Sequence, residues 1–159
     1  MIHHISIAAQ HPLHVAEVLA EIWRGQAAPF PPHPGSFMVM ALDEFGTLIE
    51  VYPAGTELTP GANEAEFSHN ATPSPYQATH AAVSVPASRE EIEQIGAREG
   101  WTVRYCSREG FFDVIEFWIE NTLMIELLTP QMAAKYIAFM QPEHLAQVLA
   151  DLALEPVTV

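Results

Sequence analysis

Residues 48–52 read Leu-Ile-Glu-Val-Tyr and residues 124–128 read Met-Ile-Glu-Leu-Leu, so a glutamate stands at the centre of two runs that are otherwise aliphatic or aromatic. A second related pair lies upstream: residues 4–9 read His-Ile-Ser-Ile-Ala-Ala, and residues 80–85 read His-Ala-Ala-Val-Ser-Val. Both pairs are 76 residues apart (80 minus 4, and 126 minus 50). A constant offset between similar segments indicates that one structural unit is used twice.

Helices are expected at equivalent places in the two copies. Residues 12–24 carry apolar side chains at helical spacing and are followed by Gly25, a common helix stop. Residues 88–91, Ser-Arg-Glu-Glu, form a capping-box pattern, which predicts that a second helix begins there and ends near Gly100.

Strands are expected to follow each helix. Residues 36–42 and 111–119 are apolar, aromatic and β-branched, and they predict strands. Residues 102–106 predict a further strand, whereas their counterpart, residues 26–34, carries four prolines and predicts an irregular edge. The repeated unit is therefore β-α-β-β-β. The predicted fold class is α+β, with two βαβββ modules forming curved mixed sheets around a shared cavity.

The repeat divides the chain into four parts. Residues 1–53 are the first module, 54–77 a linker rich in Pro, Gly, Asn, Thr and Ser, 78–130 the second module, and 131–159 a C-terminal helical extension. An apolar stripe in the extension fits a cap on the core or a dimer contact. It consists of Leu145, Val148, Leu149 and Leu152.

Composition excludes several classes of protein. With 159 residues, 49% hydrophobic and 16% charged, the chain can bury a core and is not disordered. Twenty acidic residues against six Lys and Arg give a charge of −14, which disfavours binding to nucleic acid or an anionic membrane. The one cysteine, Cys106, excludes a disulfide framework and is expected to be a packed thiol. Neither a secretory signal nor a membrane span is recognised, so a cytoplasmic protein is expected.

Strand alternation gives the repeated polar residues a common orientation. His4 shares a strand face with Ser6, and each glutamate points away from the isoleucine that precedes it. A carboxylate in an apolar strand is costly unless it is paired or bound to a metal. A single such residue is usually solvent-facing, but two His–Glu pairs at one offset favour a shared site. His4, Glu50, His80 and Glu126 supply two nitrogen and two oxygen donors, a set suited to a divalent cation.

These motifs carry a resemblance to a known family. The βαβββ repeat, the strands that open with histidine and the strands that close around glutamate resemble the vicinal oxygen chelate superfamily. Its members include glyoxalase I, bleomycin-resistance proteins, methylmalonyl thioester epimerases and extradiol dioxygenases. The turn Asp43-Glu-Phe-Gly46, shortly before Glu50, is similar to a turn of that family. The resemblance covers residues 2–130.

The resemblance implies a metal site and an activity. The four metal positions of the superfamily fall on His4, Glu50, His80 and Glu126, with His3 on the opposite strand face. They would hold one divalent ion, which could be Zn, Ni, Co, Mn or Fe. By resemblance to glyoxalase I, Glu126 would act as a catalytic base. The implied protein is a homodimeric, metal-dependent enzyme of the lyase or isomerase type, acting on a small substrate that chelates the metal through oxygen atoms.

Two alternatives stay open at this point. The chain could be a non-catalytic protein that sequesters a ligand, as bleomycin-resistance proteins do, and its charge would suit a cationic one. It could also be an extradiol-type dioxygenase, although those use two histidines and one carboxylate. Three scarce cations, Arg24, Arg104 and Arg108, are candidates for holding a substrate carboxylate. The histidines without a matched partner are expected at the surface; they are His11, His14, His33, His69 and His144.

Overall fold

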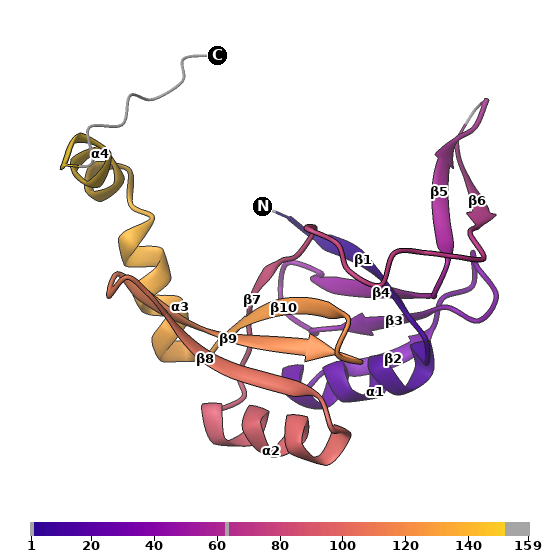
Figure 1. The fold of residues 1–159 in the computed structure, drawn as a ribbon, viewed down its shortest axis with the longest axis horizontal. Helices are drawn as coiled ribbons and strands as arrows, with labels where there is room; N and C mark the ends of the chain where they lie inside the picture. Colours follow the sequence, from indigo (N-terminus) through magenta and orange to yellow (C-terminus); the bar gives the residue numbers. More distant parts are fainter. Residues whose placement is uncertain (1, 63, 152–159) are drawn as a thin grey trace.

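A computed structural model describes residues 2–62 and 64–151 and has an α+β fold (Figure 1). Two four-stranded sheets and one two-stranded hairpin contain the strands of the described residues, and four helices accompany them. The fold class predicted from the sequence, with curved sheets and a C-terminal helical part, is confirmed.

The first sheet has the strand order β1-β4-β3-β2. Its strands are β1 (His4–Ala9), β2 (Gln26–Pro29), β3 (Phe37–Met40) and β4 (Leu48–Pro53). β1 is parallel to β4, and the other neighbours are antiparallel. The irregular edge predicted for residues 26–34 is therefore wrong in its first part. β2 is an edge strand, and a proline is tolerated at such an edge.

The second sheet repeats this order as β7-β10-β9-β8. Its strands are β7 (Ala82–Ser84), β8 (Thr102–Arg108), β9 (Phe112–Ile119) and β10 (Leu123–Leu128). The registers match, since Glu50 lies opposite Ser6 and Glu126 lies opposite Ala82. The first strand is shorter than the sequence predicts, because its pairing with β10 begins at Ala82 and leaves His80 outside the strand.

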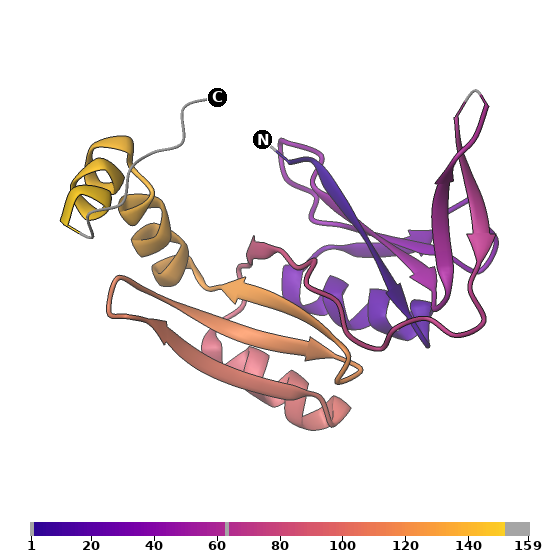
Figure 2. The same ribbon diagram turned by 45° about the horizontal axis from the view of Figure 1, so that its top comes forward.

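Helices α1 (Pro12–Trp23) and α2 (Arg89–Glu99) lie on the same side of the two sheets (Figures 1 and 2). Ser88 and Glu91 form both hydrogen bonds of the predicted capping box, which satisfies two backbone donors at the start of α2. The buried apolar side chains of α1, α2 and both sheets form one continuous cluster. The two halves of the chain therefore share a core.

Polar contacts also join the two halves. The indole nitrogen of Trp23 donates to the carbonyl oxygen of Ser84 at 3.2 Å, and the Arg98 guanidinium donates to both carboxylate oxygens of Glu21. The Glu120 carboxylate accepts from the backbone amides of Gln10 and His11 at 2.6 and 2.8 Å. Together with the shared core, these contacts hold the sheets side by side.

The linker is more ordered than its composition predicts. Strands β5 (Thr56–Pro60) and β6 (Ala65–His69) pair within it as an antiparallel hairpin that projects from the body (Figures 1 and 2). β5 reads Thr-Glu-Leu-Thr-Pro, and its two threonines are β-branched residues that favour strands. The segment predicted as a linker therefore contains a β-hairpin that the sequence analysis did not identify.

The C-terminal extension forms helices α3 (Pro130–Phe139) and α4 (Pro142–Asp151). The Thr129 side chain caps α3 by accepting from the backbone amide of Met132, which is buried in the core. The two helices rise from the body on the side opposite the hairpin (Figure 2). Leu152, the last residue of the predicted stripe, lies outside the described residues.

Truncation of Ile125 tests the shared core. Ile125 is 1% exposed and lies among apolar residues of α1 and both sheets. Ile125→Ala is expected to lower the free energy of unfolding by about 2–5 kcal/mol, through lost burial and the cavity left behind. Leu13→Ala, on the exposed side of α1, should cost less than about 1 kcal/mol. Urea unfolding of the two variants gives the comparison, and equal losses would contradict a core that spans both halves.

Candidate functional site

Glu50 lies at the centre of β4, on the sheet face that points away from α1. Its neighbours Ile49 and Val51 are buried in the core, whereas Glu50 remains partly accessible. The Ser6 hydroxyl donates to Glu50 Oε2 at 2.7 Å, and the Tyr52 hydroxyl donates to the same oxygen at 2.9 Å. Two neutral donors therefore hold this carboxylate.

Tyr52 connects Glu50 to an aromatic cluster beneath the hairpin. Its ring packs against Phe30, His33 and Phe67, with centroid separations of 5.3–5.8 Å. The prediction that His33 is a surface residue is wrong, because its ring packs on Phe67 as well and its Nδ1 contacts Ser36 Oγ at 2.8 Å. Burial, together with the hydrogen bond to the Glu50 carboxylate, raises the pKa of Tyr52 to about 12.

Glu126 holds the equivalent position in β10, but its partner is a cation. Nη2 of Arg108, at the end of β8, donates to Glu126 and to Glu116 Oε1, the latter at 3.2 Å. Burial opposes the ionised form of Glu116, yet hydrogen bonds led by that of Arg108 hold its pKa below the ordinary value. The sequence analysis missed Glu116. The β9–β10 hairpin register could have identified it, because it places Glu116 directly opposite Glu126.

Neither of the two predicted histidine ligands takes part in the hydrogen bonds of Glu50 or Glu126 described above. His4 is exposed at the start of β1. His80 precedes β7, and its ring Nδ1 contacts the carbonyl oxygen of Ala78 at 2.9 Å, so strand alternation does not orient it as predicted. Among the described residues of this single chain, no three His, Cys, Asp or Glu side chains gather in an arrangement that could hold a metal. The donor types suit a divalent cation, but one chain does not bring the four together.

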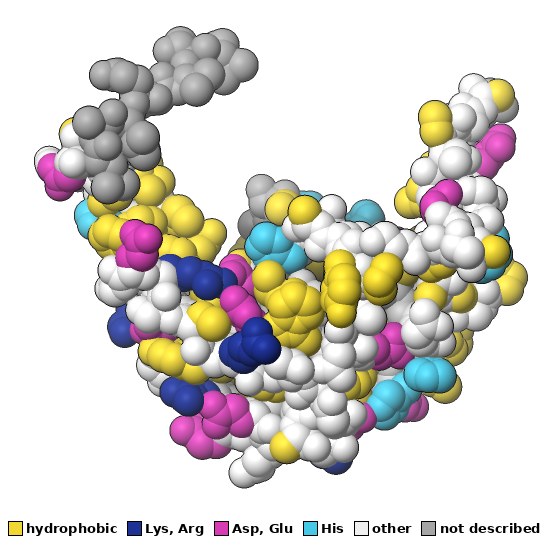
Figure 3. Space-filling model, viewed as in Figure 1, with side chains coloured by type: hydrophobic (Ala, Val, Ile, Leu, Met, Phe, Trp, Pro, Cys, Tyr) yellow, Lys and Arg dark blue, Asp and Glu magenta, His cyan; other side chains and the backbone are white. Residues whose placement is uncertain are grey.

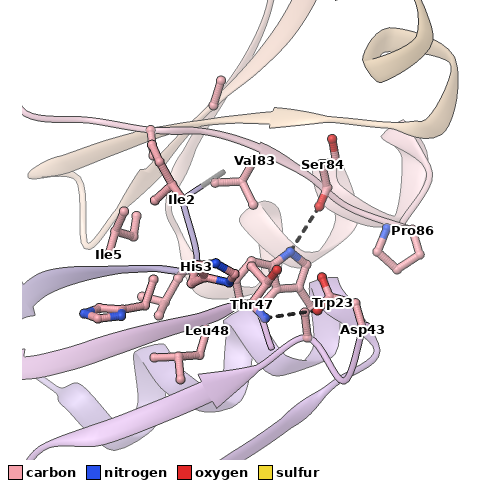
Figure 4. Close-up of a pocket in the computed structure, with 15 residues that line it drawn as sticks. Ile2, His3, Ile5, Trp23, Asp43, Thr47, Leu48, Val83, Ser84 and Pro86 are labelled. Atoms are coloured by element: carbon pink, nitrogen blue, oxygen red, sulfur yellow. Dashed lines mark hydrogen bonds between the residues drawn. The ribbon is translucent and has the colours of Figure 1, made fainter. Parts of the chain in front are cut away.

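A cavity of about 380 Å³ opens between the N-terminal end of the first sheet and β7 (Figure 4). Its walls are mainly apolar, and Trp23 and Ser84 line it where their hydrogen bond joins the two halves. His3, His4 and Asp43 supply polar groups. This volume is in the range of small-molecule pockets, so the region between the two halves can accept a small ligand.

Asp43, the first residue of the predicted Asp43-Glu-Phe-Gly46 turn, lines this cavity. Asp43 Oδ1 accepts from the backbone amides of Phe45 and Thr47, both at 3.0 Å. Hydrogen bonds from the Thr47 side chain first, and then from the backbone amides of Thr47 and Phe45, hold the pKa of Asp43 below its ordinary value. The carbonyl oxygen of Phe45 contacts His3 Nδ1 at 2.8 Å, so the His3 ring is held against this turn.

Two further side chains complete the face of the second sheet. Cys106 is half-buried in β8, and burial, followed by the charge of Glu116, raises the pKa of its thiol, which agrees with a packed and unreactive cysteine. The indole Nε1 of Trp118 in β9 is buried and has no hydrogen-bond partner within residues 2–62 and 64–151. Phe117, between Glu116 and Trp118 in β9, is buried in the core.

The arrangement of the two sheets is the fold of solved glyoxalase-family and fosfomycin-resistance proteins, to which the chain is similar in structure. The fosfomycin resistance protein FosX from Listeria monocytogenes matches with a TM-score of 0.54 at 12% identity, covering 85% of this chain and 97% of that chain. A FosX structure from the same organism, complexed with Mn(II) and sulfate ion, matches at 0.52 and 13% identity over 80% and 87% of the two chains. A glyoxalase family protein from Bacillus anthracis matches at 0.52 and 15% identity over 80% and 92%.

At the level of sequence, no protein-family model matches the chain, and the search of curated proteins finds no match. None of the helices in residues 2–62 and 64–151 is both long and apolar enough to cross a membrane.

Titration of Tyr52 tests its contact with Glu50. In the unfolded chain a tyrosine ionises near pH 10, whereas folded Tyr52 ionises near 12. Stability from this contact is therefore fully present below pH ~10 and is lost as the pH rises toward about 12. The ultraviolet absorbance difference between wild type and Tyr52→Phe should titrate near pH 12. A difference centred near pH 10 would contradict the buried, carboxylate-paired phenol.

Proposed function

We propose that this protein is a metal-dependent enzyme that acts on a small substrate carrying adjacent oxygen atoms. The observation that carries the proposal is the pair Glu50 and Glu126, which occupy matched positions on the accessible faces of two sheets with the same strand order. The fold supports it, as does the presence of Mn(II) in a FosX protein of similar structure. The reaction would be of the lyase or isomerase type.

In this proposal His4, Glu50, His80 and Glu126 hold one divalent ion. The ion would supply a Lewis acid, which stabilises negative charge that develops on substrate oxygen. Glu126 would move a proton to or from the substrate carbon as a general base. Apolar side chains on the same sheet faces, such as Met38 and Met124, would limit access of water to the substrate.

We further propose that the site is completed in a homodimer. A single chain leaves the four candidate ligands apart, and the hairpin and the C-terminal helices project from the body as two arms (Figure 3). Large apolar side chains are exposed on both arms, with Leu58 55% exposed on β5 and Ile137 59% exposed on α3. A second copy that packs between the arms would bury these side chains and bring a second set of sheet faces toward the first.

Metal titration tests the ligand set. After dialysis against a chelator, the wild-type protein should bind about one Mn²⁺ or Zn²⁺ per chain in calorimetry. His4→Ala, His80→Ala, Glu50→Gln and Glu126→Gln should each weaken binding at least about tenfold, because each removes one donor. His3→Ala is the matched control and should leave the affinity unchanged, since His3 contacts the Asp43 turn.

Two outcomes would count against this site. Equal losses of metal affinity in His3→Ala and His4→Ala would show that His4 is wrongly assigned as the histidine donor of the first strand. Absence of binding for manganese, zinc, nickel, cobalt and iron would favour the alternative function, a ligand-sequestering protein, which needs no metal.

The homodimer has its own test. Light scattering during gel filtration should give twice the 17.6 kDa mass of one chain. Ile137→Glu and Leu58→Glu place a charge on the exposed apolar arms and should shift the protein toward monomer. Gln94→Glu adds the same charge to the exposed surface of α2 and should leave the mass unchanged. A monomeric wild type would contradict the proposal.

A further inference from the structure

One guanidinium bridges the carboxylates of Glu116 and Glu126 on the face of the second sheet. Arg108 extends from the end of β8 across β9, and its Nη2 contacts Glu116 at 3.2 Å and Glu126 at once. The two glutamates lie directly opposite each other in the β9–β10 ladder. Like charges in such positions repel, so the bridging cation stabilises this face of the sheet.

The first sheet has no equivalent of this bridge. Glu50 accepts from the hydroxyls of Ser6 and Tyr52, and the residue opposite it on β3 is Met38. Hydroxyl donors leave the negative charge of the carboxylate in place, whereas Arg108 offsets it. The two matched glutamates therefore differ in their capacity to attract a cation.

A guanidinium and a divalent metal compete for the same carboxylate oxygens, and the two cations also repel each other. The side chains of Glu116 and Glu126 are only 17% and 13% exposed, so they lose much of their hydration and depend on a positive partner. The Arg108 side chain is 36% exposed and can turn into water when it leaves.

We propose that Arg108 is an internal counter-ion that competes with the metal for Glu126 and thereby sets the metal affinity of the protein. This inference rests on the proposed metal-binding function. Arg108 acts through Glu126 and is thus a positioning residue. In the metal-free chain it holds the carboxylates of Glu116 and Glu126, and metal binding requires the guanidinium to move away.

Calorimetry with Mn²⁺ on wild type and on Arg108→Gln tests the competition. Removal of the guanidinium should tighten Mn²⁺ binding about tenfold or more, while lowering the melting temperature of the metal-free protein. Arg108→Met keeps the aliphatic stem and should show the same gain, so the test survives if one variant folds poorly. Arg104→Gln is the matched control. Arg104 lies on the same strand, opposite Glu116, and its loss changes the net charge equally without removing the contact to Glu126.

The outcomes separate this inference from the function on which it rests. Tighter binding in both Arg108 variants, with no change in Arg104→Gln, supports the counter-ion. Equal gains in Arg104→Gln and Arg108→Gln would reveal only a net-charge effect and would overturn it. Unchanged or weaker binding in both Arg108 variants would also overturn it, and would leave the metal site intact if wild type binds Mn²⁺. Absence of binding in every variant would overturn both proposals.

Discussion

The burial of one face of each sheet against a shared helical layer is the constraint on which the rest of the structure depends. Ile49 and Val51 flank Glu50 in β4, and Ile125 and Leu127 flank Glu126 in β10. These four apolar side chains pack into one core with α1 and α2. Because side chains alternate strictly in a strand, this packing forces Glu50 and Glu126 onto the other face. The polar chemistry of the protein therefore lies on the side away from the helices.

The accessible faces of the two sheets stabilise their glutamate carboxylates in different ways. A carboxylate within an apolar strand needs donors, and Glu50 obtains them from two hydroxyls, whereas Glu126 obtains them from a guanidinium. The hydroxyl pair also ties Glu50 to the aromatic cluster around Tyr52, which extends to Phe67 in the hairpin. The second sheet is instead a three-residue charge network. Similar strand patterns have thus produced unequal surroundings for two matched residues.

Strand and helix patterns allowed much of the fold to be predicted. The capping box at Ser88, the alternation around both glutamates and the apolar spacing of α1 are local, and the structure agrees with each of them. Predictions based on composition were less successful. Four prolines did not prevent pairing at the start of residues 26–34, and a linker rich in small polar residues still formed the β5–β6 hairpin, because an edge strand or hairpin needs few donors in register.

By itself, the sequence determined the order of most elements in the two repeated modules, the buried face of β4 and β10, and the type of donor on their accessible faces. These features follow from the spacing of neighbouring residues. Only the tertiary structure decided the partners. Arg108 reaches Glu126 across 18 residues, and Trp23 meets Ser84 across 61. His80 leaves the strand position that repetition assigned to it. Such contacts depend on cross-strand register and on the path of the chain between elements, and no local periodicity encodes either of them.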